Sequence, residues 1–162
     1  MLSSFSALKT YLTKDIANYN GNSISKRQYF IKRGIYQLKL TKGLGVGGGA
    51  SKAIFEKEKH SAASMHNFWV ELLVEGGVLA GGGFILWYIW IAIKLYHLYH
   101  KSKKIPSILN STIMYFSGSL CTSMIGFAFA SVSTSSVIYV LPMWIMLSLA
   151  IATLNNSHSI KI

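Results

Sequence analysis

The stretch HNFWVELLVEGG, residues 66–77, marks the point at which the chain changes character. Residues 1–66 contain eleven lysines or arginines and only three acids. Farther along, no Asp, Glu, Lys or Arg occurs between residues 105 and 160. A run without charge of this length is too long for the core of a 162-residue chain, so it predicts membrane-spanning segments.

Three apolar runs have about the length that a helix needs to cross a bilayer. They cover about residues 77–96, 107–130 and 137–154. We therefore expect an all-α polytopic membrane protein with about three transmembrane helices. Residues 1–66 would form a loop segment outside the membrane, and residues 67–162 would form the membrane region.

Lysines close to the spans predict the orientation. Residues 94–104 follow the first span and contain four lysines, whereas Lys57 and Lys59 are the only basic residues shortly before it. Because short cytoplasmic loops are enriched in lysine and arginine, we expect residues 94–104 to be cytoplasmic. Residues 1–66 would then lie on the outer side.

Residues 25–41 have the pattern of a basic amphipathic helix, with Ser25 as a possible cap. The expected apolar face consists of Ile31, Ile35 and Leu38. Such a helix can lie on an anionic membrane surface. A second, short amphipathic helix is predicted within residues 5–19.

Arg27 and Arg33 in this helix are the two arginines of the chain, against fourteen lysines. The planar guanidinium group binds phosphate through two parallel hydrogen bonds, which lysine cannot do. Both arginines are therefore candidates for binding a phosphate-bearing substrate.

The glycine-rich stretch GLGVGGGAS, residues 43–51, ends the helix. It is not a P-loop, because no Gly-Lys-Ser/Thr closes it, and no βαβ unit surrounds it as in a dinucleotide-binding site. Two interpretations stay open. The stretch is a flexible turn, or Gly45 and Gly47 let the backbone approach a substrate closely.

In the opening stretch, Asn67, Glu71 and Glu75 recur every four residues and would share one helix face. Acids so close to an apolar span must point at water, at a partner charge or at a substrate. His66 precedes them at the membrane boundary. Its imidazole can transfer protons near neutral pH, so His66 is the candidate catalytic residue and the three others are candidate substrate-binding residues.

Several other classes of protein are not indicated. Cys121 is the single cysteine, so there is neither a disulfide framework nor a CxxC metal site. The sequence has no evident acid or histidine cluster for a divalent ion, no Ser-His-Asp arrangement and no nucleic-acid-binding motif. We expect no metal, no cofactor and no nucleic-acid partner.

Together, Ser25-x-Arg27, the loop Gly43-Leu-Gly-Val-Gly-Gly-Gly and the His66-Asn67 to Glu75-Gly76-Gly77 block resemble the O-antigen ligase and O-antigen polymerase (Wzy-type) superfamily. Members of that superfamily act in teichuronic acid and capsule assembly. The resemblance covers about residues 22–155 and implies a partial GT-C-like fold in the bacterial cytoplasmic membrane.

The resemblance also implies an activity. Such glycosyltransferases take an undecaprenyl pyrophosphate-linked glycan as donor, outside the cytoplasmic membrane, and transfer it to a glycan or lipid acceptor without a cofactor. The proposed base of the family corresponds to His66, and an arginine that binds the donor phosphates corresponds to Arg27.

Members of this superfamily have about ten or more spans, so the resemblance implies that the chain is a fragment or one half of a split enzyme. An N-terminal half would then be a partner. The alternative is a small integral membrane protein without catalysis, such as a scaffold subunit. A transporter subunit fits less well, because the spans contain no acid that could relay ions.

Overall fold

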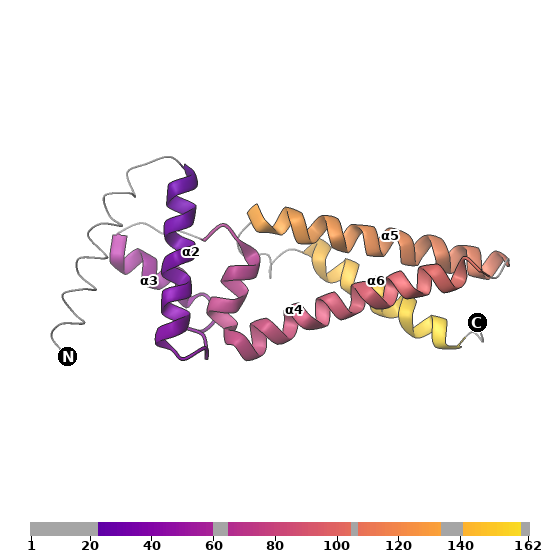
Figure 1. Cartoon of the computed structure of the whole chain (residues 1–162), viewed down its shortest axis with the longest axis horizontal. Helices are drawn as coiled ribbons and strands as arrows, with labels where there is room; N and C mark the ends of the chain where they lie inside the picture. The colour runs from indigo at the N-terminus through magenta and orange to yellow at the C-terminus, as the bar shows by residue number, and fades with distance from the viewer. Residues whose placement is uncertain (1–22, 60–64, 105–106, 134–140, 160–162) are drawn as a thin grey trace.

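The computed structural model describes residues 23–59, 65–104, 107–133 and 141–159, and these residues are almost entirely helical (Figure 1). The elements are α2 (Ser23–Leu40), α3 (Ala50–Lys59), α4 (Phe68–Ser102), α5 (Ile108–Ala130), the 3₁₀ turn η1 (Ser131–Ser133) and α6 (Leu141–Ser159). No strand occurs in these ranges. The helix predicted within residues 5–19 lies outside the described residues.

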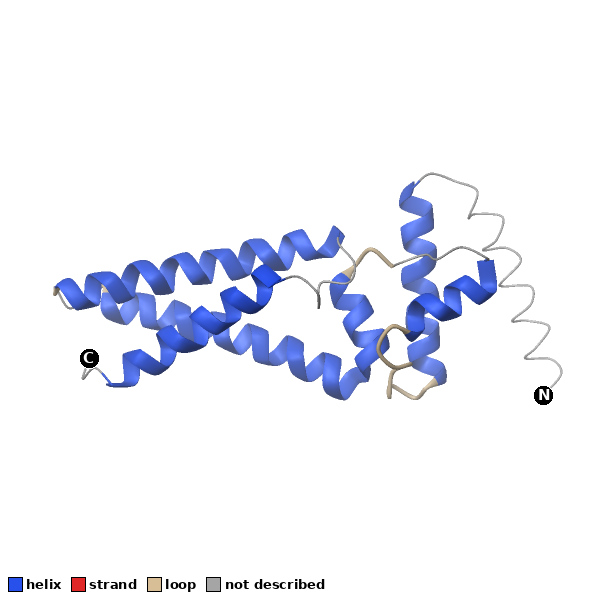
Figure 2. Ribbon diagram, turned by 180° about the vertical axis from the view of Figure 1, so that it is seen from behind, coloured by secondary structure: helices blue, strands red, loops and turns tan. Residues whose placement is uncertain are grey.

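Helix α4 is broken at Gly77, whose backbone has φ 74° and ψ 179°. Residues 68–76 form a short segment and residues 78–102 a long one. The short segment packs with α2 and α3, while the long segment runs beside α5 and contacts α6 (Figures 1 and 2). The break therefore joins two parts of the molecule. We call α2, α3, the loop between them and residues 65–76 the polar layer, and residues 78–102 with α5 and α6 the bundle.

Two helical stretches are long and apolar enough to cross a membrane among the described residues: Phe68–Ser102 and Ile108–Ser133. They cover the first two predicted spans. The third predicted span, residues 137–154, begins in residues that are not described and continues into α6. The polar residues at the end of α6 lower its hydropathy, and a third crossing stays a prediction.

The lysine-rich residues 94–104 were expected to form a loop, but α4 continues to Ser102. The reason is local, because lysine, leucine and tyrosine are compatible with a helix and no glycine or proline interrupts residues 84–104. Residues 103–107 therefore separate α4 from α5 in the sequence.

The packing face of α2 also differs from the expected one. Ile35 of the predicted face is 41% exposed, whereas Phe30 and Gly34 are buried. A Cβ atom on Gly34 would lie 2.5 Å from Met65 Sδ, so glycine permits this close approach. Helix α2 begins at Ser23, so Ser25 lies within it rather than at its cap.

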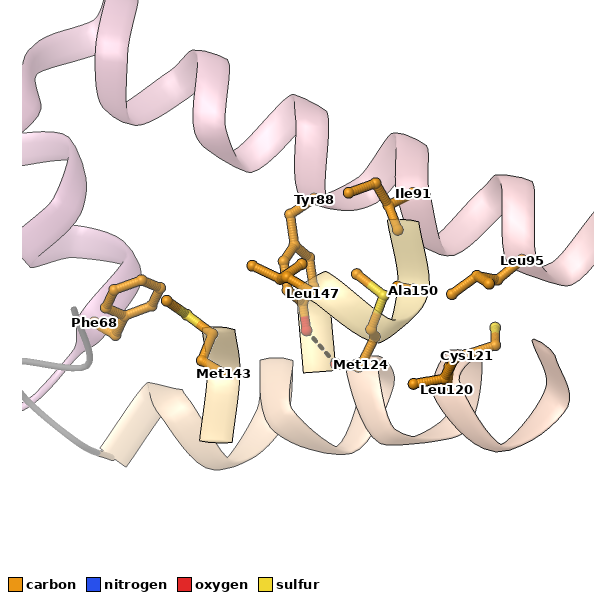
Figure 3. Close-up of a cluster of buried hydrophobic side chains, with 10 residues drawn as sticks. All are labelled: Phe68, Tyr88, Ile91, Leu95, Leu120, Cys121, Met124, Met143, Leu147 and Ala150. Carbon is orange, nitrogen blue, oxygen red and sulfur yellow. Dashed lines mark hydrogen bonds between the residues drawn. The ribbon is translucent and has the colours of Figure 1, made fainter. Parts of the chain in front are cut away.

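Two apolar clusters hold the molecule together. The first cluster joins the polar layer and contains Tyr29, Phe30, Phe55, Met65 and Val74. The second joins α4, α5 and α6 and contains Phe68, Tyr88, Ile91, Leu95, Leu120, Cys121, Met124, Met143, Leu147 and Ala150 (Figure 3). Because Cys121 is buried in the second cluster, its sulfur packs as a small apolar group there.

Candidate functional site

His66 is held in an exposed position just before α4. Its backbone has φ 48°, a left-handed conformation that few residues other than glycine adopt. Met65 and Phe68 on either side of it are 1% and 2% exposed, so both are anchored in the two clusters. The chain turns between these anchors and leaves the His66 side chain at the surface.

Asn67 is the N-cap of α4, with φ −151° and ψ 103°. Its Oδ1 accepts a hydrogen bond of 3.2 Å from the backbone N–H of Val70. The spacing of Asn67, Glu71 and Glu75 had suggested that all three share one helix face. Asn67 instead precedes the helix, so it does not share a helical face with the two acids. The cap satisfies one of the free N–H groups at the helix start.

Glu71 and Glu75 point toward the start of α3. Glu71 is only 6% exposed, and its Oε1 lies 3.9 Å from Lys52 Nζ. The Ser51 hydroxyl donates a hydrogen bond of 2.5 Å to Glu75 Oε1. We call Ser51, Lys52, Glu71 and Glu75 the carboxylate cluster. Burying a carboxylate is unfavourable without such partners, so Lys52 and Ser51 stabilise the acids there.

The glycine loop, residues 43–49, docks against the break in α4. The N–H groups of Val46 and Gly47 donate to the carbonyls of Val74 and Glu75, at 2.9 and 3.0 Å. In return, the Val78 N–H donates to the Gly43 carbonyl at 2.8 Å. The loop thus satisfies backbone groups that the broken helix cannot pair internally.

Gly45 shows how tight this contact is. A Cβ atom at this position would lie 2.5 Å from Gly77 N and 2.6 Å from the Glu75 carbonyl oxygen. By contrast, nothing lies within 4 Å of a Cβ on Gly47, Gly48 or Gly49. The structure thus shows a close backbone approach at Gly45 to α4 itself, whereas an approach of the loop to a substrate stays a prediction.

The two arginines lie on α2. Arg27 is exposed, and Arg33 is partly buried. The guanidinium carbon of Arg33 lies 5.1 Å from the centre of the Tyr36 ring, a cation–π arrangement. Arg27 thus has an accessible cation, whereas the Arg33 guanidinium already stacks on a ring of its own helix.

The structure therefore divides the predicted site residues. One group lies around the end of the short segment of α4 that is next to the break at Gly77. This group consists of Glu71, Glu75, Gly45 and Gly47. His66 and Asn67 lie at the other end of that segment, and Arg27 and Arg33 lie on α2. Ser51 and Lys52, which contact Glu75 and Glu71, were not predicted from the sequence as part of the site. The signal that could have indicated a cation is the presence of two acids next to an apolar span, because such acids need a partner charge.

No group of three or more His, Cys, Asp or Glu residues is placed to hold a metal ion within the described ranges. The carboxylate cluster contains two acids and a lysine, which disfavours a cation between them. What this part of the molecule can offer chemically is an exposed imidazole, an exposed guanidinium and a rigid backbone support.

Comparison with known proteins gives one informative match. The chain is 29% identical over 117 residues to the teichuronic acid biosynthesis protein TuaE of Bacillus subtilis (strain 168). The match covers 70% of this chain but 23% of the Bacillus protein, so the chain spans less than a quarter of that relative.

No family model matches the chain. No solved structure matches it either. The sequence is thus similar to a polysaccharide biosynthesis protein, and the O-antigen ligase and polymerase resemblance stays a prediction.

Proposed function

We propose that this chain acts in cell-surface polysaccharide biosynthesis, as part of a membrane glycosyltransferase that uses a lipid pyrophosphate-linked glycan. The observation that carries the proposal is the similarity to the Bacillus subtilis teichuronic acid biosynthesis protein over 70% of the chain. Two helices of membrane-spanning length support a location at the membrane, where a lipid-linked donor resides.

In the proposed reaction, the hydroxyl oxygen of the acceptor sugar attacks the anomeric carbon of the donor. His66 takes the hydroxyl proton on an imidazole nitrogen as the new glycosidic bond forms. The bond between the anomeric carbon and the pyrophosphate oxygen breaks, and lipid pyrophosphate leaves. The exposed His66 on a fixed turn is suited to such a role.

Arg27 is proposed to stabilise the negative charge that develops on the departing pyrophosphate. Arg27 is exposed on α2, and α2 lies beside the short segment of α4 (Figure 1). Arg33 would assist less directly. A polymerase and a ligase would both use this donor chemistry.

The remaining site residues support the layer that carries His66 and Arg27. Glu71 and Glu75 fix α3, Gly45 and Gly47 fix the break in α4, and Asn67 starts the helix that follows His66. We assign them a positioning role. The sequence also predicts that these residues contact the substrate directly, and that prediction is independent of the positioning role.

The proposal is tested by deleting the gene from the organism that encodes it and restoring it in variants. The deletion should remove or shorten a surface polysaccharide, and the wild type should restore it. His66→Ala and Arg27→Ala should not restore it, at unchanged protein abundance. His97→Ala and Lys32→Ala, at exposed positions on α4 and α2, are matched controls and should restore it.

Unchanged polysaccharide in the deletion strain would contradict the proposed function. Full restoration by both His66→Ala and Arg27→Ala would contradict the proposed roles of these residues.

A second candidate is a scaffold subunit without catalysis. It is favoured by one observation: most of the remaining site residues make contacts within the chain that explain their presence structurally, namely Asn67, Glu75, Gly45 and Gly47. For a scaffold, deletion would lower polysaccharide, but His66→Ala and Arg27→Ala would both restore it. The same experiment therefore separates the two candidates.

A further inference from the structure

The far end of α4 carries a positive charge that the nearby chain does not balance. Lys94, Lys101, Lys103 and Lys104 are all exposed. No Asp or Glu follows Glu75 in the sequence. Twenty-four residues separate Gly77 from Lys101, which is about 36 Å of helix. The acids of the described residues thus lie at the opposite end of the molecule, so these lysines require counterions from their surroundings.

A groove between α4 and α5 reaches Tyr99, two residues before Lys101, and none of its described lining residues is a lysine. Its first part has a volume of about 710 Å³ and is lined by a mixture of aromatic, hydroxyl and apolar side chains, among them Tyr96, Tyr99, Tyr115, Ser119 and Met114. Gly118 leaves room for the Tyr99 ring, since a Cβ there would lie 3.1 Å from that ring. Tyrosines at this level suit the boundary between lipid headgroups and acyl chains.

The groove continues along the bundle as an apolar channel. This second part has a volume of about 430 Å³ and shares Tyr96, Cys121 and Ile125 with the first part. Its other lining residues include Ile89, Ile93 and Phe129, and all described lining residues of both parts come from α4 and α5. Helix α6 does not line either part.

From the end of α4 toward Trp69, the exposed lysines at 101, 103 and 104 come first, the tyrosines and hydroxyl side chains of the groove follow, and the apolar part comes last. An anionic phospholipid has the matching order, with a phosphate, a glycerol backbone and acyl chains. Lysines extend their apolar stems along the protein and present the ammonium group at the headgroup level, as Lys94 does beside the Trp90 ring at 5.6 Å.

We propose that the α4–α5 groove binds an anionic phospholipid, with its phosphate at Lys101, Lys103 and Lys104 and an acyl chain between the two helices. The inference goes beyond the proposed function and requires only that α4 and α5 lie in a membrane. An uncharged lipid would leave the lysines without a counterion, and a free phosphate would leave the apolar part of the groove unfilled.

The test measures binding of phosphatidylglycerol and phosphatidylcholine, with identical acyl chains, to the purified full chain in a neutral detergent. Wild-type protein should prefer phosphatidylglycerol, and added salt should weaken the preference because it screens the lysines. The triple variant Lys101→Gln, Lys103→Gln, Lys104→Gln should reduce the preference about tenfold.

The matched control is Lys32→Gln, Lys39→Gln, Lys57→Gln, which removes the same charge from exposed positions on α2 and α3. It should change the preference clearly less than the first triple variant, because α2 and α3 do not line the groove, although the basic helix α2 can itself attract anionic lipid. Equal losses in the two triple variants would overturn the proposed site. So would the absence of any preference in wild-type protein at low salt, a result that does not depend on any variant folding.

Occupancy of the groove is tested with Ser119→Trp, which places a large ring in the first part of the groove. Ser123→Trp is the control, since Ser123 is also exposed on α5 one turn away but does not line either part. Weaker phosphatidylglycerol binding in the first variant alone supports the proposal. Displacement of the lipid by millimolar inorganic phosphate would instead assign the lysines to a free anion and overturn it.

Discussion

The polar layer and the bundle of α4, α5 and α6 are held together by different kinds of interaction. In the layer, a few directional contacts join segments that are distant in the sequence, such as Ser51 to Glu75 and Val46 to Val74. In the bundle, many apolar side chains pack together, with isolated hydrogen bonds such as Tyr88 Oη to the Met124 carbonyl at 2.6 Å. Single substitutions should therefore affect the layer more than the bundle.

The largest effect is expected for Gly45→Ala. The new Cβ would collide with the backbone of Gly77 and Glu75, and the φ of 85° is unfavourable for alanine. Together these should lower the free energy of unfolding by about 3 kcal/mol or more. Unfolding in detergent, followed by circular dichroism, measures it.

Gly48→Ala is the matched control, because nothing lies within 4 Å of a Cβ there and its φ is ordinary for alanine. It should be nearly neutral. Equal stability of the two variants would contradict the docking of the glycine loop on α4.

A smaller effect is expected for Lys52→Met. The substitution removes a cation beside the buried Glu71 carboxylate, but the Lys52 side chain is 40% exposed, so solvent weakens the pair. We expect a loss of about 1–2 kcal/mol, less than for a fully buried pair. Lys57→Met on the exposed side of α3 should be nearly neutral.

The coupling between Lys52 and Glu71 is isolated by a double-mutant cycle with Glu71→Gln. In the Glu71→Gln background, Lys52→Met should have a clearly smaller effect. Additive effects would show that the two side chains do not stabilise each other.

Asn67→Ala should destabilise the protein by about 1 kcal/mol through loss of the N-cap. Asn67→Asp retains an acceptor oxygen and should keep most of the stability. A variant Asn67→Ala that folds normally but makes no polysaccharide would instead show that Asn67 contacts the substrate.

The smallest effect is expected for Tyr88→Phe in the bundle. The ring stays in the apolar cluster, and only the hydrogen bond to the Met124 carbonyl is lost. Such bonds inside membranes contribute about 0.6 kcal/mol on average. A loss comparable to that of Gly45→Ala would show that the bundle depends on directional contacts as strongly as the layer does.

The long apolar helices could be located from sequence because apolarity is a property of continuous runs. The predicted span at residues 107–130 lies close to α5, Ile108–Ala130. Helix ends were less predictable: α4 extends to Ser102, because a lysine-rich sequence is compatible with both helix and loop.

Contacts in the polar layer were harder to predict. The face of α2 was assigned by counting large apolar residues, but Gly34, which has no side chain, lies at its centre. The partner of Glu71 could not be chosen from sixteen basic residues without knowing that α3 packs on α4. Similarly, the sequence left open whether the glycine loop is a flexible turn or approaches a substrate, and the group that lies against Gly45 is backbone 30 residues later in the chain.

The chemical role of His66 is tested most directly by comparing His66→Ala with Gly45→Ala in the gene-deletion strain, with surface polysaccharide and protein abundance measured in the same cells. We expect normal abundance without polysaccharide for His66→Ala, because the side chain is exposed and is proposed to act chemically. For Gly45→Ala we expect reduced abundance, with polysaccharide falling in proportion. Normal polysaccharide in the His66→Ala strain would contradict the proposed role of His66.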